Sequence, residues 1–217
     1  MVKDNLDKTD ANIVANLSFS QACENNKQPI LEVLQQELQA STHVLEIGSG
    51  TGQHSVYFAP RLEHLTWQTS DVFANHATIN AWHATYPAPN LYAPLIFDVS
   101  SDLVPINKAV DRPYDAVFTA NTLHIMSWSV VAKLFQLVGD VLPLNSKFIV
   151  YGPFNENGCY TSEGNRQFDH SLRQRDANSG IRHLEDVIDL ANTHYLTLSK
   201  RYAMPSNNQI LVFEKLY

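Results

Sequence analysis

The sequence predicts an α/β protein with a mostly parallel sheet covered by helices on both faces. Short apolar segments alternate with helix-like segments over most of the chain, as expected for βαβ units. A glycine-rich turn follows the first apolar segment and leads into a helix-like stretch. The last two predicted strands are joined by a few residues, too few for a parallel crossover, so they should pair antiparallel.

Composition limits the classes of protein that the chain can represent. It has 217 residues with 44% hydrophobic and 17% charged residues, which is typical of one soluble globular domain. The net charge of −7 argues against binding of nucleic acid through phosphate neutralisation. Two distant cysteines, Cys23 and Cys159, form no disulfide framework or zinc motif. No apolar run reaches the roughly 20 residues of a membrane span, so we expect a cytoplasmic protein that needs no membrane.

The predicted elements follow one another in a regular order. Residues 1–20 are rich in Asp and Asn and are expected to be mobile. The first helix is predicted to carry Pro29 in its first turn. Predicted strands cover residues 43–47, 65–70, 91–99, 115–120, 147–152, 196–204 and 209–217. Predicted helices follow the glycine turn and cover residues 73–86, 128–142 and 183–194. The polar segment 153–182 is too long for a bare connection and is expected to form a lid.

The turn in HVLEIGSGTGQHSVYF, residues 43–58, contains Gly48, Gly50 and Gly52. A dinucleotide-binding turn has the spacing G-x-G-x-x-G, whereas here the third glycine comes one residue early and Gln53 follows it. Glycine has no Cβ and accepts positive φ, so such a turn lets a ligand approach the bare backbone. The alternative is a tight strand-to-helix turn that binds nothing.

With Glu46 two residues before the first glycine, the turn reads E-x-G-x-G-x-G. This pattern resembles the first motif of the Rossmann-like methyltransferases that use S-adenosyl-L-methionine. The resemblance implies that Glu46 and the three glycines contact this cofactor, which carries no phosphate.

The ends of the next two predicted strands carry carboxylates. Asp71 could accept hydrogen bonds from both ribose hydroxyls of the cofactor, or it could cap the following helix. Val72 and Phe73 could pack against the adenine ring, or in the protein core. Asp98 could accept a hydrogen bond from the adenine amino group while the backbone amide of Val99 contacts the ring; alternatively, Asp98 caps a turn. These strand ends converge on the crevice where open α/β sheets bind ligands.

Several further segments narrow the resemblance. They are QACENNKQPILEVL, LTWQTSD, YDAVFTANTLHI, VYGPF and MPSNNQILVF, which together with the glycine turn resemble uncharacterised proteins related to methyltransferase-like protein 26. The resemblance runs from about residue 18 to the C-terminus and implies a seven-stranded methyltransferase sheet with an antiparallel last strand. It implies no substrate. One departure is LPLNSKF at residues 142–148, where many methyltransferases have a Pro-Gly-Gly turn.

Candidate catalytic residues follow the fourth and fifth predicted strands. Asn121 should lie beside the transferable methyl group, and His124 could act as a base near neutral pH or line a turn. Tyr151 and Asn155 could line the acceptor pocket or serve only in packing. Lys27 could pair with the carboxylate of the cofactor's methionine tail, or could be an exposed lysine before a helix.

These observations favour an S-adenosyl-L-methionine-dependent methyltransferase that acts on a small molecule, with no metal and no nucleic acid. The nine histidines include no metal-binding motif. One alternative is a non-catalytic protein that binds the cofactor and acts through partners. Another is a nicotinamide-dependent oxidoreductase, which Gln53 disfavours.

Overall fold

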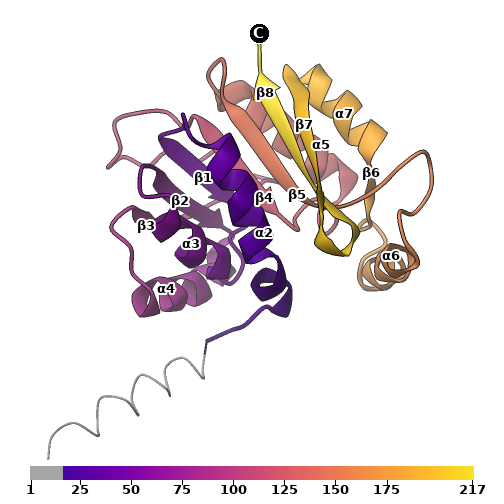
Figure 1. Ribbon diagram of the computed structural model, residues 1–217, viewed down its shortest axis with the longest axis horizontal. Helices are drawn as coiled ribbons and strands as arrows, with labels where there is room; N and C mark the ends of the chain where they lie inside the picture. Colours follow the sequence, from indigo (N-terminus) through magenta and orange to yellow (C-terminus); the bar gives the residue numbers. More distant parts are fainter. Residues whose placement is uncertain (1–16) are drawn as a thin grey trace, which may run out of the picture.

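The computed structural model describes residues 17–217. Most of the segment expected to be mobile, residues 1–16, lies outside the described residues. The strands form one sheet in the order β3-β2-β1-β4-β5-β8-β7, with the short strand β6 beside β5 (Figure 1). Pairing is parallel from β3 through β5, whereas β8 runs antiparallel to both of its neighbours. The predicted fold class is confirmed, with one more strand than the seven expected.

The strands are β1 (His43–Ile47), β2 (Thr66–Asp71), β3 (Leu91–Ile96), β4 (Ala116–Ala120), β5 (Lys147–Asn155), β6 (Arg182–His183), β7 (Leu196–Met204) and β8 (Asn208–Lys215). The α-helices are α2 (Gln21–Glu37), α3 (Gln53–Phe58), α4 (His76–Thr85), α5 (Trp128–Val141), α6 (Glu163–Arg175) and α7 (Leu184–Thr193). Short 3-10 turns cover Ala59–Arg61, Phe73–Asn75 and Pro205–Asn207. None of these helices is long and apolar enough to cross a membrane.

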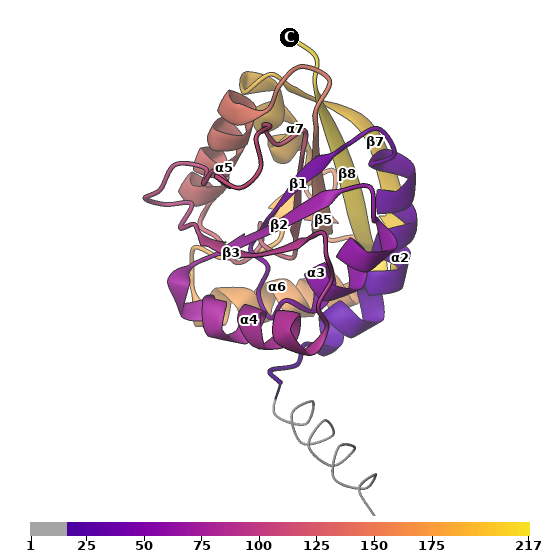
Figure 2. The ribbon, with the colours of Figure 1, turned by 90° about the vertical axis from the view of Figure 1, so that its left-hand side faces the viewer.

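Helices cover both faces of the sheet and bury a separate apolar cluster on each (Figure 2). Successive side chains of a strand point to opposite faces, and β4 shows the consequence. Its Val117 lies in the cluster with α5 and α7, while Phe118 lies in the cluster with α2 and α3. The carboxyl ends of the parallel strands are thus held at one edge by two buried layers.

Helix α2 begins eight residues before Pro29, so the prediction that this proline lies in the first turn is wrong. Ser20 is extended, and its hydroxyl accepts a hydrogen bond from the backbone N–H of Cys23, which caps the helix there. A proline inside a helix costs about 3 kcal/mol because it removes a backbone hydrogen bond. Burial of Ile30 and Leu34 beyond it offsets that cost.

Helix α6 lies within the polar segment that was expected to form a lid, and its helical state was not predicted. Ser162 caps it by accepting a hydrogen bond from the N–H of Asn165. Its buried residues are Asn165, Asp169 and Leu172, so just one apolar side chain is buried. Phe168 and Leu172 are the large apolar residues of the helix, too few to form a recognisable apolar stripe, which explains why the helix was missed. The segment also contains the end of β5.

Candidate functional site

The glycine turn, residues 48–52, follows β1 and takes its shape from its neighbours. Gly48, Gly50 and Gly52 all have positive φ, at 73°, 60° and 88°. A Cβ on Gly48 would lie 2.6 Å from the Thr122 side chain, and one on Gly52 would lie 3.1 Å from the backbone of Ile79. Two of the glycines therefore let neighbouring elements approach closely. A Cβ on Gly50 would meet nothing within 4 Å, so this part of the turn faces open space.

Asp71, the last residue of β2, joins the second strand to the glycine turn. Its Oδ2 accepts a hydrogen bond of 2.7 Å from the N–H of Gly50. Its Oδ1 accepts from the N–H of Val72 at 2.7 Å and from the Asn75 side chain at 2.8 Å. The carboxylate thus binds the turn and also the start of the next helical segment. Oδ1 already accepts two bonds, whereas Oδ2 can accept one more, which fits a hydroxyl group of a ligand.

Glu46 lies beneath the glycine turn and is 2% exposed. Its carboxylate accepts a hydrogen bond of 2.9 Å from the indole N–H of Trp67 on β2. Burial, reinforced by the nearby charge of Asp71, raises the pKa of Glu46 to about 7. In this position Glu46 supports the turn from below; direct contact with a cofactor stays a prediction.

The residues predicted to surround an adenine ring differ in their surroundings. Val72 and Phe73 are exposed beside Asp71, Phe73 at 73%, so neither packs in the core. Asp98 is exposed and accepts hydrogen bonds from both the N–H and the hydroxyl of Ser100, which lower its pKa. The structure therefore shows the turn-capping role that was the alternative for Asp98. Val99 is buried, and contact of its amide with a ring stays a prediction.

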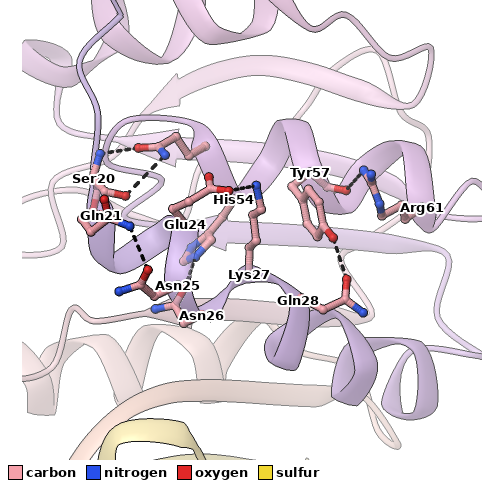
Figure 3. Close-up of polar contacts among 11 residues, drawn as sticks. Ser20, Gln21, Glu24, Asn25, Asn26, Lys27, Gln28, His54, Tyr57 and Arg61 are labelled. Atoms are coloured by element: carbon pink, nitrogen blue, oxygen red, sulfur yellow. Dashed lines mark hydrogen bonds and ion pairs between the residues drawn. The ribbon is translucent and has the colours of Figure 1, made fainter.

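Lys27 on α2 faces the outer surface of α3 (Figure 3). Its ammonium pairs with Glu24 and lies 4.7 Å from the ring centroid of Tyr57. These residues line a cavity of about 670 Å³ together with Arg61 and Gln53. Gln53 directly follows the glycine turn, so Lys27 lies near that turn. The charge of Lys27 is already paired with Glu24. Its predicted contact with a carboxylate stays a prediction.

A second cavity, of about 280 Å³, lies at the carboxyl ends of β4 and β5 and is called the amide pocket here. It is lined by Ala22, Asn25, Asn26, Asn121, Tyr151, Pro153, Asn165, Phe168, Pro205, Ser206 and Asn208. Two of the predicted catalytic residues, Asn121 and Tyr151, are thus brought together. Asn121 has φ of 59°, and its N–H donates to the carbonyl of Tyr151 at 2.9 Å. The next residue, Thr122, packs on Gly48.

His124 lies behind the amide pocket and is 6% exposed. Its ring meets the ring of Phe168 edge-on, with centroids 5.2 Å apart. Burial, reinforced by the positive charge of Arg182, lowers the pKa of His124 to about 4. The imidazole is therefore neutral at pH 7, and it supports the wall of the pocket through Phe168. Asn155, the last residue of β5, is buried and does not line the pocket.

The sequence predicted that segment 153–182 covers the acceptor site, but it did not indicate which residues of α2 and α6 line the amide pocket. Asn26 is buried, and its Oδ1 lies 2.7 Å from Nε2 of the buried His54 (Figure 3). Asn25, Asn165 and Phe168 also line the pocket. Asparagines in helices carry no spacing signal, so only the topology could have brought them together. Among residues 17–217, no group of three or more His, Cys, Asp or Glu side chains could hold a metal ion.

Solved structures with the same fold include several methyltransferases, some of them crystallised with S-adenosylmethionine or S-adenosylhomocysteine. An O-methyltransferase family protein from Burkholderia thailandensis matches with a TM-score of 0.72 at 11% identity, over 88% of this chain and 56% of its own. An O-methyltransferase family 2 protein from Planctomyces limnophilus, crystallised with apigenin, matches at 0.71 and 12%, over 88% and 62%. Human N-acetylserotonin methyltransferase, crystallised with S-adenosylmethionine, matches at 0.69 and 12%, over 88% and 55%.

The chain spans little more than half the length of these structures. At these identities the likeness defines the class of fold, that of the Rossmann-like methyltransferases. The chain itself belongs to the family described as "Protein of unknown function (DUF938)", whose model matches residues 17–215.

Proposed function

We propose that this protein is an S-adenosyl-L-methionine-dependent methyltransferase that acts on a small molecule. The loop after β4 supports the proposal most directly, because it borders both parts of the site. Thr122 packs on Gly48 of the glycine turn, and Asn121 lines the amide pocket. A cofactor in the glycine turn and an acceptor in the amide pocket would therefore meet at this loop.

Residues at the glycine turn fit such a cofactor. Asp71 would accept a hydrogen bond from a ribose hydroxyl, while Val72 and Phe73 offer exposed apolar surface to a base. The open side of Gly50 leaves room against the backbone. When bound, the cofactor supplies an electrophilic methyl group.

The protein's own part in the reaction would be binding and alignment. Alignment of two reactants can contribute about 7–11 kcal/mol of a barrier. Asn121 and the hydroxyl of Tyr151 would orient the acceptor, and His124 would hold Phe168 in the wall. Because burial lowers the pKa of His124 to about 4, this imidazole is unprotonated at neutral pH but a weak base, which favours a positioning role over proton transfer.

The segment 153–182 would cover the acceptor, since Asn165 and Phe168 of α6 line the amide pocket. We also propose that the chain is one domain, that it is cytoplasmic, and that its family is related to methyltransferase-like protein 26. The small-molecule acceptor agrees with the apigenin bound to the Planctomyces limnophilus protein. A non-catalytic cofactor-binding protein would share the glycine turn and differ in the amide pocket.

Calorimetric titration of the purified protein with S-adenosylhomocysteine and, separately, with NAD tests the proposal. We expect micromolar binding of S-adenosylhomocysteine and none of NAD. Incubation with methyl-labelled S-adenosylmethionine and a pool of cell metabolites should then label one or more small molecules. Binding of NAD alone would contradict the cofactor assignment, and cofactor binding without any labelled product would favour the non-catalytic alternative.

A further inference from the structure

The amide pocket is defined by its lack of charge. Among the described residues that line it, none carries a charged side chain, and five of eleven are asparagines. Burial of an ion is unfavourable unless an opposite charge pairs with it. The lining therefore selects against both anions and cations.

Three titratable groups at or directly behind the amide pocket are also uncharged at neutral pH. Burial raises the pKa of the Tyr151 hydroxyl and that of the Cys23 thiol, which keeps both protonated. His124 is neutral for the same physical reason. These groups supply hydrogen-bonding atoms without supplying charge.

Two arginines of the neighbouring helix α6 are engaged with carboxylate partners. On α6, Arg173 pairs with the buried Asp169 at 2.8 Å. Arg166 on the same helix pairs with Glu163 at 2.6 Å. An anionic acceptor would have to break one of these pairs to gain a counter-charge from either arginine.

The asparagines offer both donors and acceptors. His54 engages Oδ1 of Asn26, and the Asn26 amide nitrogen, which has two N–H groups, faces the Tyr151 hydroxyl and remains a donor on this side of the pocket. Asn165 donates its amide nitrogen to the Thr161 hydroxyl at 2.8 Å, which leaves its oxygen as an acceptor. The rings of Tyr151 and Phe168 supply apolar walls between them.

We infer that the acceptor bound in the amide pocket is a small uncharged molecule that combines a ring with amide or hydroxyl groups. The apolar walls take the ring, and the asparagines take the polar groups. That this ligand accepts a methyl group rests on the proposed function. The selectivity of the pocket for uncharged ligands can be measured without any methyl transfer.

Three probes of matched shape test the selectivity: benzamide, benzoate and benzylamine, which are neutral, anionic and cationic at pH 7. Each is titrated into the ¹⁵N-labelled protein with and without S-adenosylhomocysteine, and the side-chain amide signals of Asn25, Asn26 and Asn165 are followed. We expect benzamide to shift these signals at millimolar concentration and the charged probes to bind about tenfold more weakly or less. Equal or tighter binding of a charged probe, or no binding of any probe, would overturn the inference.

An Asn25→Asp variant sharpens the test, because it places a carboxylate at the pocket while Oδ1 can still accept from Gln21. The preference should then move from benzamide toward benzylamine. Gln36→Glu adds the same charge at an exposed position of the same helix and should leave the preference unchanged. An unchanged preference in Asn25→Asp would count against the charge argument. Failure of S-adenosylhomocysteine to bind, with benzamide still preferred, would overturn the proposed function alone.

Discussion

The glycine turn and the amide pocket border the same loop after β4, yet they are built from different chemical groups. The turn combines backbone of positive φ with the carboxylates of Asp71 and, below it, Glu46. The pocket consists of neutral amides, rings and prolines drawn from α2, β5, α6 and the β7–β8 turn. One region is local and charged, whereas the other is assembled from distant segments and is neutral.

This difference teaches how such a site divides its tasks. A turn that is shaped by its close neighbours can hold one invariable ligand, because few side chains could vary without strain. A pocket made of single side chains from several elements can be changed residue by residue. We therefore expect substitutions in the glycine turn to affect folding, and substitutions in the amide pocket to affect selectivity.

The largest effect is expected for Gly48→Ala, because its Cβ would lie 2.6 Å from Thr122 and its φ is 73°. The left-handed backbone costs roughly 1–2 kcal/mol and the overpacking about 1–3 kcal/mol, so unfolding should become easier by about 3 kcal/mol. Urea denaturation measures this change. Gly158→Ala is a matched control with the same φ and no atom within 4 Å of its Cβ, and should lose about 1 kcal/mol. Equal losses of unfolding free energy in the two variants would show that the glycine turn does not contact the loop after β4 at Thr122.

The next effect is a pH dependence of stability that arises from Glu46. Burial and the charge of Asp71 raise the pKa of this residue from 4.5 to about 7. Between these values the folded state binds more protons than the unfolded state, so the free energy of unfolding falls as pH rises from 4.5 to 7. Glu46→Gln keeps an acceptor for the Trp67 indole N–H. Because glutamine does not titrate, the variant should not show this fall in the free energy of unfolding. Above pH 7 we expect the variant to gain on the order of 2 kcal/mol relative to the native chain in denaturation measurements.

Glu37 provides the contrast, because its pKa shifts in the opposite direction. Burial favours protonation, but bonds from Lys200, Tyr202 and Lys147 outweigh it and lower the pKa to about 2. Its contribution is present above pH 4.5 and is lost as pH falls toward 2. Glu37→Gln should therefore destabilise the protein at pH 7, whereas Glu46→Gln should not. Parallel pH profiles for the two variants would contradict this assignment of charges.

The smallest effect concerns the caps of two helices and tests whether α6 can open as a lid. Ser162 caps α6 and Ser127 caps α5, and alanine at such a position costs about 1 kcal/mol. Helix α5 buries many apolar side chains, whereas Leu172 is the one apolar side chain that α6 buries. Ser127→Ala should therefore lower global stability, while Ser162→Ala should raise hydrogen exchange mainly within α6. Global loss of stability in both variants would argue against a separately opening lid.

The fold was largely predictable because its signals are local. Apolar segments of strand length, the three glycines and the short link before β8 each carry their meaning within a few residues. The start of α2 was misjudged because Pro29 is a stronger signal in sequence than the cap at Ser20. Helix α6 was missed because its buried face is mostly polar, with Asn165 and Asp169 where an apolar pattern would stand.

In the site, the residues at strand ends were predictable, whereas those on helices were not. Asp71 was found through its place at a strand end, and the structure brings its carboxylate to Gly50. Asn121 and Tyr151 were found through their places at the ends of the fourth and fifth predicted strands, and both line the amide pocket. Asn25, Asn26 and Asn165 were not found, since they come from helices whose approach depends on tertiary packing.

The most direct test of the account compares two carboxylates in titrations with S-adenosylhomocysteine. The free acceptor site on Oδ2 of Asp71 can take one hydrogen bond from a ribose hydroxyl, worth about 1.5–3 kcal/mol, so Asp71→Asn should weaken binding by about tenfold to a hundredfold. Asp98 caps its own turn through Ser100, so Asp98→Asn should weaken binding by less than about tenfold. Circular dichroism verifies that both variants are folded. Native affinity in Asp71→Asn, or no binding by the native protein, would contradict the account.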